Sequence, residues 1–162
     1  MFRNAQRMKT GFIVTLAVSL APLAVWAQPV RWQNYVVPES GAIAQIPTNI
    51  FSEDGGQPVP GYGRRFFTSD RSANLTIQAI PNNANDSPAV FLAKKNPPSD
   101  VRYKRVTSRF FVVSSYRDNK IWYNRCNFTA RFVNCVLINY PASEKRRWDS
   151  VVTRISNTFA SN

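Results

Sequence analysis

The sequence predicts an α+β protein with an antiparallel sheet of five to seven strands, one long C-terminal helix and one short helix packed on it. Short segments rich in β-branched and aromatic residues, separated by turn residues, fill most of the chain after residue 60. Apolar residues near the C-terminus recur at helical spacing instead. A length of 162 residues with 44% apolar content suits one domain with its own core.

The N-terminal half predicts short strands around one long loop. Residues 28–38 carry Trp32 and Tyr35 and predict a first strand or an apolar strap, and residues 41–47 predict a short strand that ends at Pro47. Residues 52–63 contain four glycines and two prolines, which predicts a loop. Strands follow over residues 64–69 and 73–80, with a turn at Asp70-Arg71-Ser72 between them.

The strand over residues 73–80 alternates apolar and polar side chains. This period of two predicts one buried face and one solvent-exposed face, the latter made by Asn74, Thr76 and Gln78. Ser87 then predicts a helix N-cap, with Pro88 at the first helical position. The short helix covers residues 89–95 and stops before Pro97-Pro98.

The remaining strands and the long helix follow without a break. Strands are predicted over residues 101–106, 109–115, 120–128 and 133–140. Pro141 cannot continue the last strand, so the helix is expected from Ser143 onward. One apolar stripe at helical period should pack on the sheet; it consists of Trp148, Val151, Val152, Ile155 and Phe159.

Residues 1–27 predict a cleaved signal peptide. Arg3, Arg7 and Lys9 form a positive n-region, an apolar run covers residues 11–25, and cleavage is expected after Ala27. The run is shorter than the roughly 18 to 20 residues that a spanning helix needs. Residues 28–162 should then be a single periplasmic or secreted domain, without stable membrane insertion. Losing the three cations lowers the net charge from +12 to +9.

Cys126 and Cys135 predict a disulfide. If their strands pair through a four-residue loop over residues 129–132, the two cysteines face each other. Two cysteines in an oxidising compartment are more often bonded than free. A redox pair or a metal site is the alternative, but CxxC spacing is absent and two thiolates supply half a zinc site.

The composition excludes several reaction classes. The chain has no histidine, which removes Ser-His-Asp and Cys-His triads and imidazole bases. Its nine carboxylates are dispersed, so no metal or cofactor site is predicted, and a small carboxylate-dependent hydrolase stays open only as an alternative. Gly61-Tyr62-Gly63 before two arginines lacks the spacing of a phosphate loop and predicts a turn.

The basic residues are the candidate binding groups. Arg102 and Lys104 should share one face of a strand, with Arg105 on the other. Lys145, Arg146 and Arg147 fall in the first helical turn, where the helix dipole disfavours cations. These charges predict an acidic partner, with anionic lipid or polysaccharide of the cell envelope as the alternative. Nucleic acid is not expected for an exported protein.

A set of aromatic, proline and turn positions is scattered along the chain: Trp32-x-x-Tyr35, Ile46-Pro47, Phe66-x-x-Ser69-Asp70-x-x-Ala73-x-Leu75, Tyr123-x-Arg125-Cys126, Tyr140-Pro141 and Arg154-Ile155 with Phe159. In these positions the chain resembles small exported proteins of alphaproteobacteria, most of them uncharacterised, and the PsbP-like fold. Where a glycine is common after the turn aspartate, this chain has Arg71. The resemblance implies a curved antiparallel sheet flanked by helices, and a protein-binding or assembly role with no catalytic set.

Sequence reasoning therefore predicts a non-enzymatic, exported binding or accessory module without a cofactor. The candidate contacts to its anionic partner are Arg102, Lys104, Lys145, Arg146 and Arg147. The sequence predicts neither the identity of the partner nor an oligomeric state.

Overall fold

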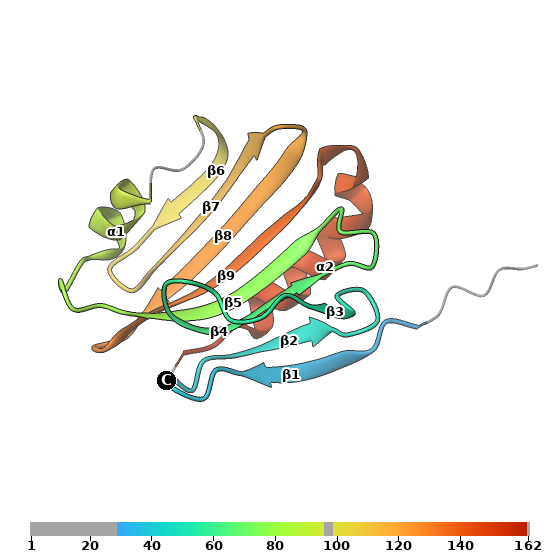
Figure 1. The fold of residues 1–162 in the computed structure, drawn as a ribbon. Coiled ribbons are helices and arrows are strands. Elements are labelled where there is room, and N and C mark those ends of the chain that lie inside the picture. The colour runs from blue at the N-terminus through green and yellow to red at the C-terminus, as the bar shows by residue number, and fades with distance from the viewer. Residues whose placement is uncertain (1–28, 96–98, 162) are drawn as a thin grey trace, which may run out of the picture.

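The computed structural model describes residues 29–95 and 99–161, so the predicted signal peptide lies outside the described residues. In chain order the elements are β1 (Trp32–Val36), β2 (Ile43–Pro47), β3 (Glu53–Asp54), β4 (Tyr62–Phe67), β5 (Asn74–Pro81), α1 (Pro88–Lys94), β6 (Asp100–Val106), β7 (Phe110–Arg117), β8 (Lys120–Phe128), β9 (Phe132–Pro141), the 3₁₀ turn η1 (Ala142–Glu144) and α2 (Lys145–Thr158). Seven strands form one antiparallel sheet in the order β3-β4-β5-β9-β8-β7-β6 (Figure 1). The predicted α+β class is confirmed.

The first two strands form a small sheet of their own. β1 and β2 pair with each other, and β2 packs against α2. Past the end of α2, Ala160 exchanges two backbone hydrogen bonds with Ile43 and so ties the C-terminal end of the described chain to β2. The β1–β2 pair lies beside the main sheet, and α2 lies behind the strands in the view of Figure 1. Helix α2 is therefore held between two sheets.

Helix α2 packs through the predicted apolar stripe. All five residues of the stripe are buried, in one cluster with the α2-facing side chains of β5 and β9. Pro141 is the last residue of β9, paired with Lys120, and the helix is entered through η1. The expectation that Pro141 lies outside the strand is wrong because a proline lacks only the N–H donor, and a strand end tolerates that loss.

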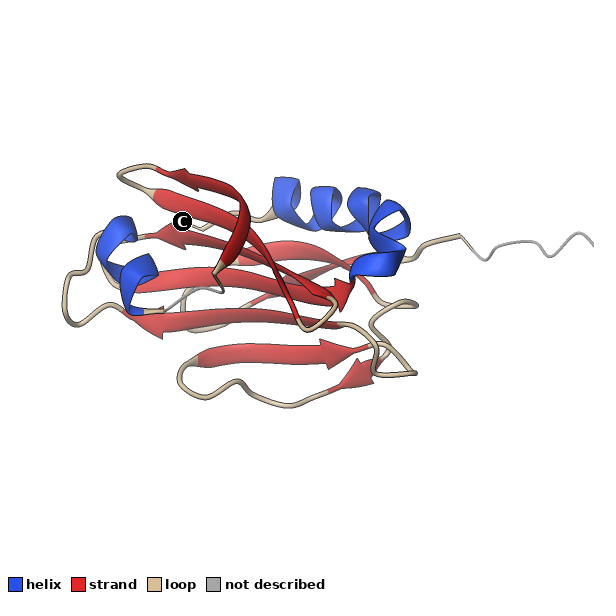
Figure 2. Ribbon diagram, turned by 90° about the horizontal axis from the view of Figure 1, so that it is seen from above, coloured by secondary structure: helices blue, strands red, loops and turns tan. Residues whose placement is uncertain are grey.

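Helix α1 covers one end of the opposite sheet face. Ser87 is its N-cap and accepts a hydrogen bond from the Val90 N–H, with Pro88 at the first position, as predicted. Phe91 and Leu92 pack into a second cluster with Phe111, Val113, Cys126, Val133 and Cys135. The two helices lie at opposite ends of the molecule (Figure 2). Within residues 29–95 and 99–161, no helix therefore covers much of this second face.

The turn between β4 and β5 accommodates Arg71 where glycine is common. Arg71 has a left-handed φ of 55°, a conformation that costs a non-glycine residue about 1–2 kcal/mol. The Asp70 carboxylate accepts hydrogen bonds from the Thr68 hydroxyl at 2.6 Å and from the Ser72 N–H at 3.0 Å. These bonds, that from Thr68 above all, lower the pKa of Asp70 to about 2. Side-chain hydrogen bonds thus hold the turn without glycine.

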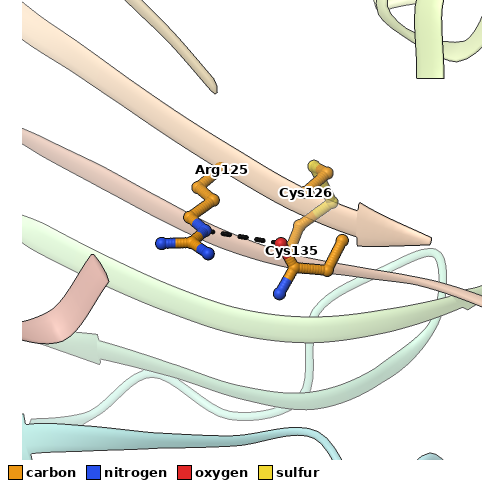
Figure 3. The surroundings of a disulfide bond; sticks show 4 residues. Arg125, Cys126 and Cys135 are labelled. Atoms are coloured by element: carbon orange, nitrogen blue, oxygen red, sulfur yellow. Dashed lines mark hydrogen bonds between the residues drawn. A yellow bond between two sulfur atoms is a disulfide. The ribbon is translucent and has the colours of Figure 1, made fainter. Parts of the chain in front are cut away.

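The β8–β9 register places the cysteines opposite each other. Cys126 pairs with Cys135, with 4.1 Å between their Cα atoms, and their sulfur atoms are bonded. The same register pairs Tyr123 with Ile138, as the sequence predicts. Arg125, next to Cys126 on β8, extends its side chain away from the sulfur atoms (Figure 3). The disulfide thus joins β8 to β9 covalently, on the sheet face that α1 packs against.

We expect reduction of the disulfide to lower the free energy of unfolding by about 2.5–3 kcal/mol. Reduction opens a short loop and so raises the conformational entropy of the unfolded chain. Urea unfolding of the mature protein with and without reductant measures the loss. The double variant C126A/C135A should show a comparable loss without reductant and no further change with it. Equal unfolding midpoints for the oxidised and reduced protein would contradict the expectation.

Candidate functional site

A groove lies between α2 and the β6 side of the main sheet. It encloses about 630 Å³ and holds four of the six tyrosines of the chain. Helix α2 forms one wall and strands β6, β7, β8 and β9 form the rest. The residues around it are Arg102, Tyr103, Ser114, Tyr116, Ile121, Tyr123, Tyr140, Lys145, Asp149, Val152 and Thr153. We call this surface the tyrosine groove.

Strand alternation and register bring the tyrosines together. Tyr116 pairs with Ile121, and Ile121 pairs in turn with Tyr140, so these side chains share one face of the sheet. Tyr123 lies two residues after Ile121 on the same face. Tyr103 reaches this face from β6, where it pairs with Ser114, and is 51% exposed. The tyrosines therefore run from a buried inner end to an open outer end.

The inner tyrosines are held as neutral phenols. Tyr140 stacks on Trp148 with ring centroids 5.5 Å apart. Burial, and secondarily the Asp149 carboxylate, raises the pKa of Tyr140 to about 12. Burial also raises the pKa of Tyr123, whose hydroxyl lies 2.6 Å from the Ser156 hydroxyl. The inner end of the groove therefore offers aromatic rings and hydroxyls that donate and accept hydrogen bonds, and Tyr123 and Tyr140 stay protonated at neutral pH.

Two of the predicted basic residues lie in the tyrosine groove. The Arg102 guanidinium lies 5.3 Å from the centre of the Tyr116 ring, and its Nε lies 2.9 Å from an Asp100 oxygen. The Lys145 ammonium lies 2.8 Å from Asp149, and this hydrogen bond raises the pKa of Lys145. Both ion pairs are exposed, and exposed ion pairs contribute little to stability. A partner carboxylate can therefore replace Asp100 or Asp149 at small cost.

The other three predicted residues lie elsewhere. Lys104 pairs with Val113, which belongs to the cluster on the α1 side, so Lys104 and Arg102 lie on opposite faces. The expectation that they share a face is wrong because a register shift, typical of a β-bulge, falls between Val101 and Tyr103. Arg146 and Arg147 lie beside a separate shallow depression with Ser143 and Glu144.

Sequence reasoning missed the aromatic part of the site. The predicted β8–β9 register already places Tyr123 and Tyr140 on one face, and that signal identifies half of the tyrosine set. The other two, Tyr103 and Tyr116, depend on the pairing of β6 with β7 and on the register shift within β6. No local pattern marks that shift.

The outer wall of the groove is a free sheet edge. Among the described residues β6 pairs only with β7, so its other side presents backbone N–H and C=O groups. Every residue of β6 except Val106 is exposed. Lys104 and Arg105 on this strand form no ion pair within the described ranges, and Arg105 lies over the Phe110 ring at 5.4 Å. The edge is thus basic as well as open.

Eight of the nine carboxylates are held in other contacts. Seven of the nine lie within 3.4 Å of a cation, and Asp70 holds the β4–β5 turn. Asp149 is the one carboxylate around the tyrosine groove, where a glycosidase-type site needs two. Within the described ranges no three Asp, Glu or Cys residues gather as a metal site would require. Nor does any described helix have the length and apolar character to cross a membrane.

Comparison with known proteins identifies the fold. A scan against protein-family models and a search of curated proteins find no match. Among solved structures, the chain is similar to the solution structure of cyanobacterial PsbP (CyanoP) from Synechocystis sp. PCC 6803, with a TM-score of 0.59. The match covers 88% of this chain and all of the other, at 9% sequence identity. The expected PsbP-like α+β architecture is therefore confirmed at the level of fold.

Proposed function

We propose that this protein is an exported, non-enzymatic binding module that holds an acidic, extended segment of a partner protein against β6 and the tyrosine groove. One observation carries the proposal: Arg102 and Lys145 lie in a single tyrosine-lined groove beside an open, basic sheet edge. Export follows from the predicted signal peptide, and the Cys126–Cys135 bond is consistent with an oxidising compartment. No cofactor is required.

The sheet edge favours an extended partner. An added strand can pair with the free N–H and C=O groups of β6, which supplies affinity that does not depend on sequence. Specificity then comes from side chains that alternate along the added strand. Those on the groove side meet Tyr103 and Tyr116, whose rings provide contact area at low entropic cost.

The charges favour an acidic partner. β6 carries Arg102, Lys104 and Arg105 against one acid, Asp100, and Lys145 faces it across the groove. Complementary charge accelerates association and disfavours basic partners. Cations along an exposed edge also prevent two copies of the same strand from pairing with each other.

A site-specific crosslinker tests the proposal. A photoreactive phenylalanine analogue at Tyr103 should capture a protein of the native envelope, and the captured segment should be acidic. The same analogue at Arg131, in the β8–β9 turn, serves as the control position. Capture that is equal at both positions, or a captured segment without excess acid, would reject the groove as the binding site.

The contribution of charge is tested with two variants that lose equal charge. We expect R102A/K145A to weaken binding of the captured partner about tenfold, a change of about 1.4 kcal/mol. R146A/R147A removes two cations from the neighbouring depression and should change affinity less than about twofold, as expected for charges outside the interface. Affinity of the unmodified protein should fall as salt rises. Equal losses in the two variants would show that only net charge matters.

A further inference from the structure

A second cavity lies on the opposite face of the main sheet, beside α1. It encloses about 250 Å³ and is separate from the tyrosine groove, with which it shares no residue. Its apolar part is formed by Leu92 of α1, Phe111, Leu137 and the bonded cysteines. The strands around it are β5, β7, β8 and β9, so its shape is set by the sheet itself.

The rest of the lining is polar and comes from the strands. Asn74 pairs with Asn139 across β5 and β9, and Asn139 pairs with Trp122 across β9 and β8, so all three share this face. Thr76, Gln78 and Asn124 lie on it as well. The face that the β5 pattern predicts to be solvent-exposed is buried at Thr76 and Gln78 and partly buried at Asn74. Thr76 is 8% exposed and Gln78 is 7% exposed.

Several of these groups lack a partner among the described residues. The indole Nε1 of Trp122 and Oδ1 of Asn139 are fully buried atoms without a hydrogen bond. The structure records none from the side chains of Thr76 or Gln78 either, whereas Asn139 donates through Nδ2 to Asn74. A buried polar group left unpaired costs about 1–3 kcal/mol. Folded proteins pair nearly all such groups. Six side-chain atoms of the described residues are buried without a partner, and the two at this cavity, together with Thr76 and Gln78, would gain partners from a molecule bound in it.

The charge around the cavity has one sign. Lys95 and Arg117 line it, and no carboxylate of the described part of the chain does. The Arg117 guanidinium lies 5.9 Å from the centre of the Trp122 ring and pairs only with the exposed Asp118 at 3.2 Å. A ligand with a carboxylate can take both cations as partners. Its remaining groups must both donate and accept hydrogen bonds, as the amides of Gln78 and Asn124 do.

We propose that this cavity binds a sugar acid, that is, a pyranose ring that carries a carboxylate. Each sugar hydroxyl donates and accepts, which matches the side-chain amides, and one hydroxyl accepts from the Trp122 N–H. The C–H face of the ring lies on the apolar floor, and the carboxylate lies toward Arg117 and Lys95. Free sugar acids and terminal uronate units of a polysaccharide share this chemistry.

Titration followed by ¹⁵N NMR tests the proposal on the oxidised mature protein. Its indole N–H signals come from Trp32, Trp122 and Trp148. Glucuronate and galacturonate should shift the Trp122 signal, assigned by its loss in W122F, and leave the other two in place. Saturation in the millimolar range or below supports the proposal. A Trp122 signal that does not move with either sugar acid overturns it.

Matched ligands and variants separate the contributions. Glucose lacks the carboxylate and acetate lacks the ring, so each should bind at least about tenfold more weakly than glucuronate. W122F keeps an aromatic ring but loses the N–H donor, and we expect about a fivefold loss of affinity. R117Q should weaken glucuronate binding and leave glucose unchanged, whereas R131Q should change neither. Equal binding of glucose and glucuronate, or of acetate and glucuronate, overturns the assignment.

The source of the sugar and the independence of the two sites are tested in the same way. Tighter binding of tri-galacturonate than of galacturonate identifies a polysaccharide end as the ligand, and equal binding identifies the free acid. Because the cavity shares no residue with the tyrosine groove, W122F should leave crosslinking from position 103 unchanged. Either of the two proposals, the sugar-acid site or the partner-binding groove, can therefore fail while the other stands.

Discussion

Replacement of Trp148 by alanine should lower the free energy of unfolding by about 3–5 kcal/mol, the range for a large aromatic residue removed from a core. Trp148 is 3% exposed, and its ring lies 5.6 Å from Phe51 and 5.5 Å from Tyr140 between centroids. Phe51 belongs to the segment after β2, and Tyr140 belongs to β9. One side chain of α2 thus packs against both the segment after β2 and strand β9. Neither of these can move in to fill the cavity that alanine leaves.

Urea unfolding of W148A and of two control variants measures this effect. W148F keeps a ring and loses the Nε1 hydrogen bond to Glu144, which is 3.1 Å long, so it should lose about 1–2 kcal/mol. S150A changes an exposed position on the same helix and should stay within about 0.5 kcal/mol of the unmodified protein. A loss below about 2 kcal/mol in W148A would show that the core relaxes around the site. Because Trp148 supports Tyr140, W148A should also weaken binding in the tyrosine groove.

The sequence predicts well those features that depend on neighbouring residues. The β8–β9 register follows from a short loop, alternating side chains and two cysteines, and the structure has this register. The α2 stripe follows from helical spacing alone, and all its residues are buried. In both cases the residues that decide the structure lie within about twenty positions of each other, where period and turn chemistry apply.

The sequence does not predict the features that depend on distant pairing. The register shift in β6 is set against β7, and it moves Arg102 to the face opposite Lys104. The separate β1–β2 sheet depends on packing against α2, more than a hundred residues later. Only Arg102 and Lys145 of the predicted basic residues therefore meet in the groove.

The polar cavity shows a second limit of pattern reasoning. Alternation in β5 correctly separates the two faces of the strand, since Leu75 and Ile77 lie in the α2-side core and Thr76 and Gln78 lie opposite. Alternation does not tell whether the polar face meets water. Here Leu92 of α1 and the disulfide between β8 and β9 line a cavity over that face. A polar stripe is thus evidence for a hydrogen-bonding surface, and tertiary packing decides whether it is exposed.

Replacement of Gly63 by alanine should destabilise the fold by about 3 kcal/mol or more. Gly63 lies in β4 with a φ of 112°, and a Cβ at this position would overlap the backbone carbonyl of Ile77 on β5. An unfavourable backbone conformation costs about 1–3 kcal/mol, and overpacking adds about 1–3 kcal/mol. The overlapping atom is backbone of a buried central strand, so it cannot move away as a flexible side chain does.

Gly56 is the matched control, because it also has a positive φ, of 77°, but no atom lies near the position of its missing Cβ. G56A should therefore show only the conformational cost of about 1–2 kcal/mol. Thermal and urea unfolding of the two variants separates strain from overlap. If G63A and G56A lose equal stability, close approach of β4 to β5 does not explain the Gly61-x-Gly63 pattern. If G63A loses more, close packing of β4 on β5 explains the glycine pattern. The glycines followed by Arg64 and Arg65 then give no evidence of a phosphate-binding site.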